Sequence, residues 1–323
     1  MVVNAANEDK DWDWLNAVNE GRVLIDREHP DKKVLSKAIL RNLKDPSSGE
    51  RRRIDLALQG PRSLAILQSL TDDRKVKDAL ARVRRTDLIE VELAGLDLVI
   101  ARTGYCGEEV GYEIFVHPDQ ASALWNLLLE EGKPFGLQPT GLACRDSTRT
   151  EAGLPLYGHE LAGPFGINPI EAGFSGYVKL HKPFFIGRRA LMEKGYNTGK
   201  EVVRFRMNEK GVRVPKTGDP VVNKRGKYIG VVTSCAIDSQ GYLLGLAYVD
   251  KRYNREGERI GIFALPGKVP PGKSMDELTA GDRVLLHDEA TVLTRFPTPE
   301  EKETWRGKPA KKVTTFMDLV QTE

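Results

Sequence analysis

The sequence predicts an α+β protein that ends in a small antiparallel β-barrel. Over residues 1–195, stretches with helical spacing of apolar residues and stretches with alternating apolar residues follow one another irregularly. A doubly wound parallel sheet would need a regular alternation of strands and helices. From residue 201 onward, short strand-forming segments are separated by turn residues, which is typical of a barrel or sandwich. A domain boundary is therefore expected near residues 195–200.

The first region begins with a clear helix signal. Asn7 is suited to cap a helix whose apolar residues recur at helical spacing, and Gly21 is suited to end it. Ala94-Gly95 joins two alternating segments and predicts a hairpin. A further helix is expected to begin at Pro61. The other expected elements are strands at residues 22–26, 54–58, 88–93, 96–100, 112–116 and 177–180, the end of a strand at 2–3, and helices at 31–45, 74–84, 118–131, 140–153 and 188–194.

The expected domains are a first region at residues 1–195, a β-barrel at 196–296 and a charged, loose tail at 297–323. A loop rich in proline and glycine, residues 266–281, is expected to interrupt the barrel. The expected barrel strands are residues 202–207, 220–222, 228–232, 243–249, 259–265, 282–287 and 290–296.

Composition excludes several classes of protein. The 323 residues suffice for two or three domains, and 49 Lys and Arg against 46 Asp and Glu leave a net charge of +3, which disfavours a nucleic-acid binder. No apolar run approaches the roughly 18 residues of a membrane span. Three widely spaced cysteines and five scattered histidines indicate neither a disulfide framework nor a metal site. We expect a cytoplasmic protein that binds neither nucleic acid nor a membrane.

One stretch matches a nucleotide-binding pattern by letter only. Gly267-Lys-Val-Pro-Pro-Gly-Lys-Ser274 has the spacing of a phosphate-binding loop. Such a loop points successive backbone N–H groups at phosphates, and Pro270 and Pro271 have none. No long helix can follow, because Gly281 closes the next segment. We therefore interpret the stretch as a barrel loop.

A glycine-punctuated segment, residues 102–115, enters a predicted strand that carries Glu113. In that strand Glu113 shares a face with Phe115. A carboxylate there is either at a solvent edge or facing a pocket, where two adjacent N–H groups of a heterocycle can satisfy both of its oxygens. Cys106, in the same turn, is either a reactive thiol or a small buried residue, and no histidine adjacent in sequence is available to activate it.

The predicted helix at residues 140–153 places two arginines on one face. Arg145 and Arg149 are four residues apart and repel one another unless an anion lies between them, and Asp146 serves only part of that need. A ligand carboxylate, carbonyl or phosphate is one solution. An internal ion-pair network is the other.

Several separated motifs, in order, resemble the glycine-cleavage T-protein, or aminomethyltransferase, family. The resemblance covers most of residues 1–265 and implies a three-lobed fold around a central folate pocket, with a β-barrel at its end. The motifs are Val2-Val-Asn-Ala-Ala-Asn7, Leu58-Gln-Gly-Pro61, Arg102-Thr-Gly-Tyr105, Gly141-Leu-Ala-Cys-Arg-Asp146, Glu151-Ala-Gly153, Glu171-Ala-Gly173 and Phe185-Ile-Gly-Arg188.

The resemblance also implies a site. Asn4, Tyr105, Glu113 and Arg145 stand at positions that line the folate pocket in the family. Glu113 would accept hydrogen bonds from the amino edge of the pterin, Arg145 would hold an oxygen or carboxylate of the cofactor, and Asn4 would lie close to the transferred carbon. The implied cofactor is tetrahydrofolate.

Three departures from the family pattern accompany the resemblance. The family's catalytic aspartate would precede Met1, so no catalytic residue is expected in this chain. The segment between Tyr105 and Glu113 is one residue longer than usual, and Ser175-Gly176-Tyr177 replaces a frequent tryptophan. Strands of the first lobe would also precede Met1, which suggests a fragment, or one subunit of a split enzyme whose N-terminal partner chain supplies them.

The function implied is a tetrahydrofolate-dependent aminomethyl transferase, which receives its one-carbon group from the lipoyl carrier protein of the glycine cleavage system. One alternative is a folate-dependent demethylase of the same superfamily, acting on a small S-, N- or O-methyl substrate. The other alternative is a non-catalytic folate-binding module, although the Lys-Gly-Cys motif of the iron–sulfur assembly relatives is absent.

Overall fold

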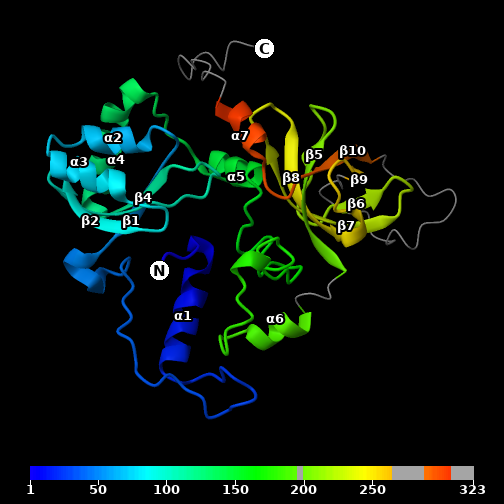
Figure 1. Cartoon of the computed structure of the whole chain (residues 1–323), viewed down its shortest axis with the longest axis horizontal. Helices are drawn as coiled ribbons and strands as arrows, with labels where there is room; N and C mark the ends of the chain where they lie inside the picture. The colour runs from blue at the N-terminus through cyan, green and yellow to red at the C-terminus, as the bar shows by residue number, and fades with distance from the viewer. Residues whose placement is uncertain (195–198, 264–286, 307–323) are drawn as a thin grey trace. The chain divides into compact units, whose positions relative to one another are not determined.

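The structure, a computed structural model, describes residues 1–194, 199–263 and 287–306 (Figure 1). The chain divides into two compact units, Met1–Val202 and Val203–Glu323. Helices and an antiparallel sheet make up the first unit, and a closed antiparallel barrel makes up most of the second. The predicted α+β class with a C-terminal barrel is therefore confirmed. In the described part of the chain, no helix has both the length and the apolar character needed to cross a membrane.

The sheet of the first unit has the strand order β1-β4-β3-β2. Adjacent strands are antiparallel, and β2 and β3 form the predicted hairpin, whose turn residues Ala94 and Gly95 have positive φ angles of 50° and 76°. This turn conformation matches the twist of the two strands. The strand bounds are β1 Ile54–Gln59, β2 Leu88–Leu93, β3 Leu96–Ala101 and β4 Gly111–Val116.

Three helices cover one face of this sheet (Figure 1). They are α2 Ser63–Ser69, α3 Arg74–Arg82 and α4 Ala121–Gly132. Every second residue of β4 faces them, so that Ile114 is fully buried together with Leu67 of α2 and Leu80 of α3. Full burial of one such side chain stabilises the fold by about 1.5–3 kcal/mol. The remaining residues of the strands, among them Glu113, lie on the other face.

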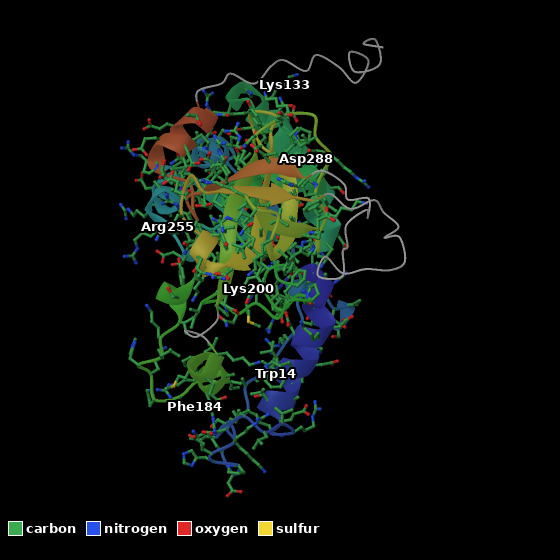
Figure 2. The ribbon with its side chains drawn as sticks, turned by 90° about the vertical axis from the view of Figure 1, so that its right-hand side faces the viewer. Trp14, Lys133, Phe184, Lys200, Arg255 and Asp288 are labelled. Atoms are coloured by element: carbon green, nitrogen blue, oxygen red, sulfur yellow. The ribbon has the colours of Figure 1, made fainter. Side chains whose placement is uncertain are left out.

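The predicted first helix is present as α1, Glu8–Asn19, and Gly21 follows it with a positive φ of 71°. Trp14 on this helix is 46% exposed and is labelled in Figure 2. The sequence predictions for residues 2–3, 22–26 and 31–45 were wrong, because these residues form no strand or long helix. Leu35 is fully exposed and Ile39 is 84% exposed, so the apolar stripe of residues 31–45 has no core to bury against. Propensity alone rarely stabilises a short helix.

The end of the first unit also differs in part from the prediction. Residues 142–151 form helix α5, Leu142–Glu151, and residues 188–194 form α6, Arg188–Lys194, both as expected. The strand expected at residues 177–180 is absent, and a 3-10 turn, Ser175–Tyr177, precedes extended chain instead. Tyr177 is 78% exposed, so its aromatic ring is not recruited into a sheet.

The barrel closes in the order β10-β5-β8-β7-β6-β9. Phe205 of β5 fills its centre, and a Cβ on Gly245 of β8 would lie 2.5 Å from the Phe205 ring, so only glycine fits there. Asp288, labelled in Figure 2, pairs β10 with Ile262 of β9. The bounds are β5 Lys200–Met207, β6 Pro220–Asn223, β7 Tyr228–Ile237, β8 Leu243–Asp250, β9 Arg259–Ile262 and β10 Asp288–Leu293.

The expected loose tail begins instead with a helix, α7, Pro299–Arg306. The reason is a buried charge, since Arg204 of β5 is fully buried and donates to both carboxylate oxygens of Glu301 at 2.6 and 2.8 Å. A buried guanidinium needs such a partner. The phosphate-loop look-alike at 267–274, the loop at 266–281, most of the strand expected at 282–287 and residues 307–323 lie outside the described residues.

Candidate functional site

Glu113 lies in the middle of the sheet. Its strand, β4, is flanked by β1 and β3, so Glu113 is not at a sheet edge. The residues opposite it are Ala57 on β1 and Ala101 on β3. Side chains directly opposite in a sheet are about 4.5–5.5 Å apart, so the two side chains next to Glu113 on the neighbouring strands are both small.

The environment of Glu113 is unusual for a carboxylate. Partial burial raises the pKa of Glu113 above its ordinary value of 4.5, the negative charge of Asp55 raises it further, and the positive charge of Arg145 acts in the opposite direction. A half-buried carboxylate of this kind gains stability from added hydrogen-bond donors. Glu113 is therefore ready to accept hydrogen bonds from a ligand.

The two arginines of α5 have different roles. Arg149 is buried and forms ion pairs with Asp146 at 2.6 Å and with Glu160 at 3.0 Å. Of the two alternatives, an internal ion-pair network therefore balances the charge of Arg149. Arg145 is exposed, and its side chain has no hydrogen bond or ion pair with any residue that the structure describes. Arg145 alone keeps a free guanidinium, and it lies near enough to act on the pKa of Glu113.

Tyr105 lies in the glycine-rich turn, between Gly104 and Gly107. Its hydroxyl donates a hydrogen bond to the backbone oxygen of Pro155. Burial raises the pKa of Tyr105 to about 12, with smaller opposing effects from charges that include Arg149 and Arg145. Tyr105 is thus a neutral hydrogen-bonding group near neutral pH. Through Arg145 it shares an electrostatic environment with Glu113.

Asn4 is connected to this group indirectly. It caps a 3-10 turn, Ala5–Asn7, and its Oδ1 accepts from the Ala6 backbone N–H at 3.0 Å and from Asn7 Nδ2 at 3.3 Å. Asn7 Nδ2 also donates to the Tyr157 backbone oxygen at 3.5 Å. Asn7, which hydrogen-bonds Asn4, and Tyr105 therefore contact the same segment, residues 155–157, from different elements.

Gln59 at the end of β1 organises the glycine-rich turn. Its Nε2 donates to the backbone oxygens of Thr103 at 3.3 Å and Tyr112 at 3.1 Å. A Cβ at Gly104 or Gly111 would lie only 1.9 or 2.3 Å from Gln59 Oε1. Sequence reasoning did not assign Gln59 a role, although it stands in the Leu58-Gln-Gly-Pro61 motif. The turn that carries Tyr105 is built around this side chain.

Cys106 has no features of a reactive thiol. Its Sγ donates to Gln59 Oε1 at 3.4 Å, and burial raises the pKa of the Cys106 thiol above its ordinary value. A reactive cysteine needs a lowered pKa. Within the described residues, His, Cys, Asp and Glu form no group of three or more that could hold a metal ion.

These features agree with comparisons against known proteins. Residues 1–182 match the family model described as the GCVT N-terminal domain. An aminomethyltransferase of Thermoanaerobacter sp. (strain X514) is 36% identical over 279 residues, which cover 81% of this chain and 64% of that relative. An aminomethyltransferase of Streptomyces avermitilis is 43% identical over 206 residues, covering 62% of this chain and 53% of that relative.

A solved structure gives the same result. The glycine cleavage system aminomethyltransferase T of Bartonella henselae is similar with a TM-score of 0.58 and 27% identity, over 75% of this chain and 59% of that one. The mixed sheet-and-helix unit followed by a closed barrel is thus shared with a family of group-transfer enzymes. This chain belongs to the GCVT aminomethyltransferase family, and it spans about 64% of the length of the Thermoanaerobacter relative.

Proposed function

We propose that this chain binds tetrahydrofolate and takes part in the transfer of a one-carbon group to it, as an aminomethyltransferase. The single observation that carries the proposal is that a half-buried carboxylate, Glu113, lies near a guanidinium, Arg145, and that Arg145 has no hydrogen bond or ion pair with any described residue. One group accepts hydrogen bonds and the other donates them. Family membership supports the choice of a folate as the ligand.

In this proposal Glu113 accepts hydrogen bonds from two neighbouring N–H groups of the pterin ring. The small residues beside it, Ala57 and Ala101, allow a flat ring to approach the carboxylate. Arg145 pairs with an oxygen or carboxylate of the same ligand, which suits the fork of a guanidinium. Tyr105 contributes a neutral hydroxyl, already oriented by Pro155.

Bound tetrahydrofolate supplies the amine that accepts the methylene carbon while ammonia leaves and the carrier thiol is released. Asn4 is assigned to the vicinity of that carbon, held in place by Asn7. The residues of this chain orient the acceptor, which lowers the barrier mainly through positioning. The proposed donor is the aminomethyl group on a lipoyl carrier protein of the glycine cleavage system.

Calorimetric titration with 5-formyl-tetrahydrofolate, a stable folate, tests the binding step. We expect saturable binding that weakens about tenfold or more in Glu113→Gln and in Arg145→Gln, because each loses a charge-assisted contact. Glu92→Gln, on the exposed face of β2, and Arg74→Gln, at the start of α3, are matched controls that should bind normally. Absence of saturable binding to the unmodified chain would sink the proposal.

The product identifies the reaction. With an aminomethylated lipoyl carrier protein as donor, we expect 5,10-methylene-tetrahydrofolate and ammonia in equal amounts. Formation of 5-methyl-tetrahydrofolate from a methylated substrate would identify a demethylase instead. Folate binding with neither product would identify a binding module.

A further inference from the structure

A cavity of about 540 Å³ lies in the first unit, and the proposed function does not use it. Its lining comes from helix α1 and from the segment that leads into β1, residues 40–51, and includes none of Asn4, Tyr105, Glu113 or Arg145. Residues 40–51 form irregular chain with a turn at residues 43–45, followed by a 3-10 segment, Pro46–Arg51, rather than a long helix. The sequence did not predict the structure of this segment, and it therefore did not predict the cavity.

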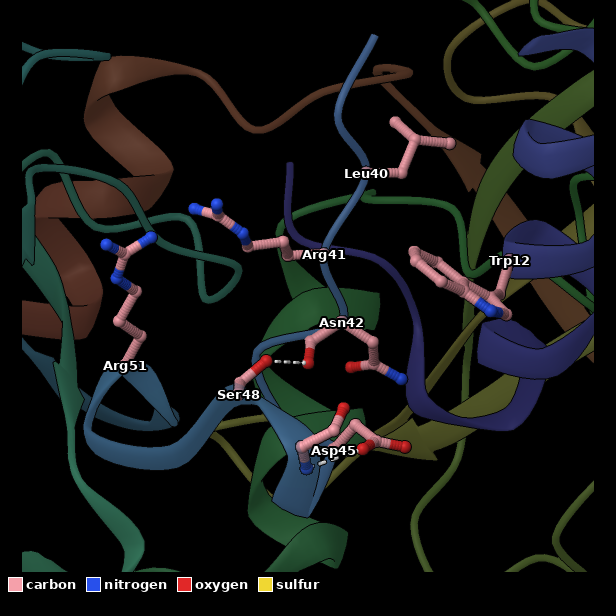
Figure 3. Close-up of a pocket in the computed structure, with 8 residues that line it drawn as sticks. Trp12, Leu40, Arg41, Asn42, Asp45, Ser48 and Arg51 are labelled. Carbon is pink, nitrogen blue, oxygen red and sulfur yellow. Dashed lines mark hydrogen bonds between the residues drawn. The ribbon is translucent and has the colours of Figure 1, made fainter. Parts of the chain in front are cut away.

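One wall of the cavity is apolar. Trp12 projects from α1 into the space beside Asn42, and Leu40 lies on the same side (Figure 3). Trp12 and Leu40 are each partly exposed. An indole ring and an aliphatic side chain form a surface on which a flat apolar group can pack.

The opposite wall carries two arginines. The guanidinium groups of Arg41 and Arg51 extend toward one another in Figure 3. Both side chains are exposed, and neither has a hydrogen bond or ion pair with any residue in the described part of the chain. Lys44, the other cation within residues 40–51, contacts Glu8. Within these residues, Arg41 and Arg51 are therefore the two cations without a carboxylate.

Hydrogen bonds within the chain hold the polar residues that line the cavity between these two walls. Ser48 Oγ donates to the backbone oxygen of Asn42 at 2.7 Å, and Asp45 Oδ1 accepts from the Ser47 backbone N–H at 2.8 Å. Hydrogen bonds from Ser47 lower the pKa of Asp45, so its carboxylate stays ionised and engaged at the start of the 3-10 segment. The cavity lining holds two guanidinium charges against this one carboxylate.

We propose that this cavity is a binding site for a small molecule that joins an oxyanion to a flat apolar group. The oxyanion, a carboxylate or a phosphate, lies between Arg41 and Arg51, whose planar forks match such groups in geometry and charge. The flat group packs on Trp12 and Leu40. This site is separate from the residues assigned to folate, so the inference does not depend on the proposed function.

The test uses the whole chain labelled with ¹⁵N and follows the arginine Nε–Hε signals by NMR. Phenyl phosphate and phthalate are the two probes, one for each kind of oxyanion, and benzyl alcohol is the uncharged comparison. We expect saturable shifts of the Arg41 and Arg51 signals with at least one anionic probe and none with benzyl alcohol. The probe that saturates identifies the oxyanion.

Variants decide whether the binding is specific. Arg41→Gln and Arg51→Gln should each weaken binding by about tenfold, because each removes one charge-assisted contact. Arg27→Gln is the matched control, since Arg27 is an exposed arginine that does not line the cavity. Thermal unfolding of each variant confirms that it is folded. No saturable shift with either anion, or equal weakening by Arg27→Gln, would overturn the proposal.

Discussion

The side chain of Gln59 occupies the space in which a side chain at Gly111 would have to lie. The two residues face one another across strands β1 and β4, and an added Cβ at position 111 would be 2.3 Å from Gln59 Oε1. This contact sets the path of the chain just before Glu113. Binding residues gain precision when packed groups of this kind hold the backbone that carries them.

Gly111→Ala tests this contact. The new methyl group must displace a side chain that takes part in three hydrogen bonds, so we expect a loss of about 1–3 kcal/mol in the free energy of unfolding. Urea denaturation measures it. Gly176→Ala, at a glycine with open space around it, should change little. In the double variant Gln59→Ala, Gly111→Ala the losses should be less than additive, and strict additivity would contradict the account.

The buried ion pair between Arg149 and Glu160 should be important for stability. Both side chains are at most 1% exposed and lie 3.0 Å apart. Glu160→Ala leaves a buried guanidinium without its buried carboxylate partner, and we expect a loss of about 3–5 kcal/mol. The surface pair of Arg189 and Glu193 is the comparison, and Glu193→Gln should cost less than about 1 kcal/mol. Similar costs for both substitutions in urea denaturation would argue against the buried network.

The link between Arg204 and Glu301 should hold helix α7 on the barrel. Arg204 is fully buried and donates to both carboxylate oxygens of Glu301. Glu301→Ala should therefore lower the thermal unfolding midpoint of the barrel and increase hydrogen exchange in residues 299–304. Glu303→Ala, at an exposed position on the same helix, is the control. Unchanged exchange in Glu301→Ala would show that the ion pair does not order the helix.

Glu113 should make the stability of the chain depend on pH. Partial burial, followed by the charge of Asp55, raises the pKa of Glu113 in the folded chain above 4.5. The folded state then binds the proton of Glu113 more tightly than the unfolded state does. The stability that Glu113 contributes is therefore fully present below pH 4.5 and is lost as the pH rises through the raised pKa. Glu113→Gln should therefore gain stability relative to the unmodified chain as the pH increases from 4 to 8. A difference that is constant or changes in the opposite direction would be incompatible with this environment.

Local signals in the sequence were sufficient for much of the fold. The hairpin at Ala94 and Gly95 was predictable because the turn and its flanking alternation are adjacent in the chain. The prediction of a helix at residues 31–45 was wrong for the opposite reason. Their spacing suits a helix, but Leu35 and Ile39 find no surface to pack on, and that depends on tertiary structure.

The candidate site was predictable only in part. The placement of Glu113 and Arg145 remains a prediction as far as folate is concerned, but the spacing of Arg145 and Arg149 correctly raised the question of their partners. The partner of Arg149 that the sequence did not indicate is Glu160, which is 11 residues further along the chain. Gln59 was not assigned a role because its glycine neighbours lie 45 and 52 residues further along the chain. Contacts over such separations leave no local pattern.

We propose that the ionised carboxylate of Glu113 holds a folate, and folate affinity measured as a function of pH tests this role most directly. Calorimetry with 5-formyl-tetrahydrofolate would be carried out from pH 8 down to pH 5 on the unmodified chain and on Glu113→Gln. We expect the advantage of the unmodified chain to be largest at pH 8 and to shrink as the pH falls toward the raised pKa of Glu113. Equal affinity of the two proteins across this range would contradict the account.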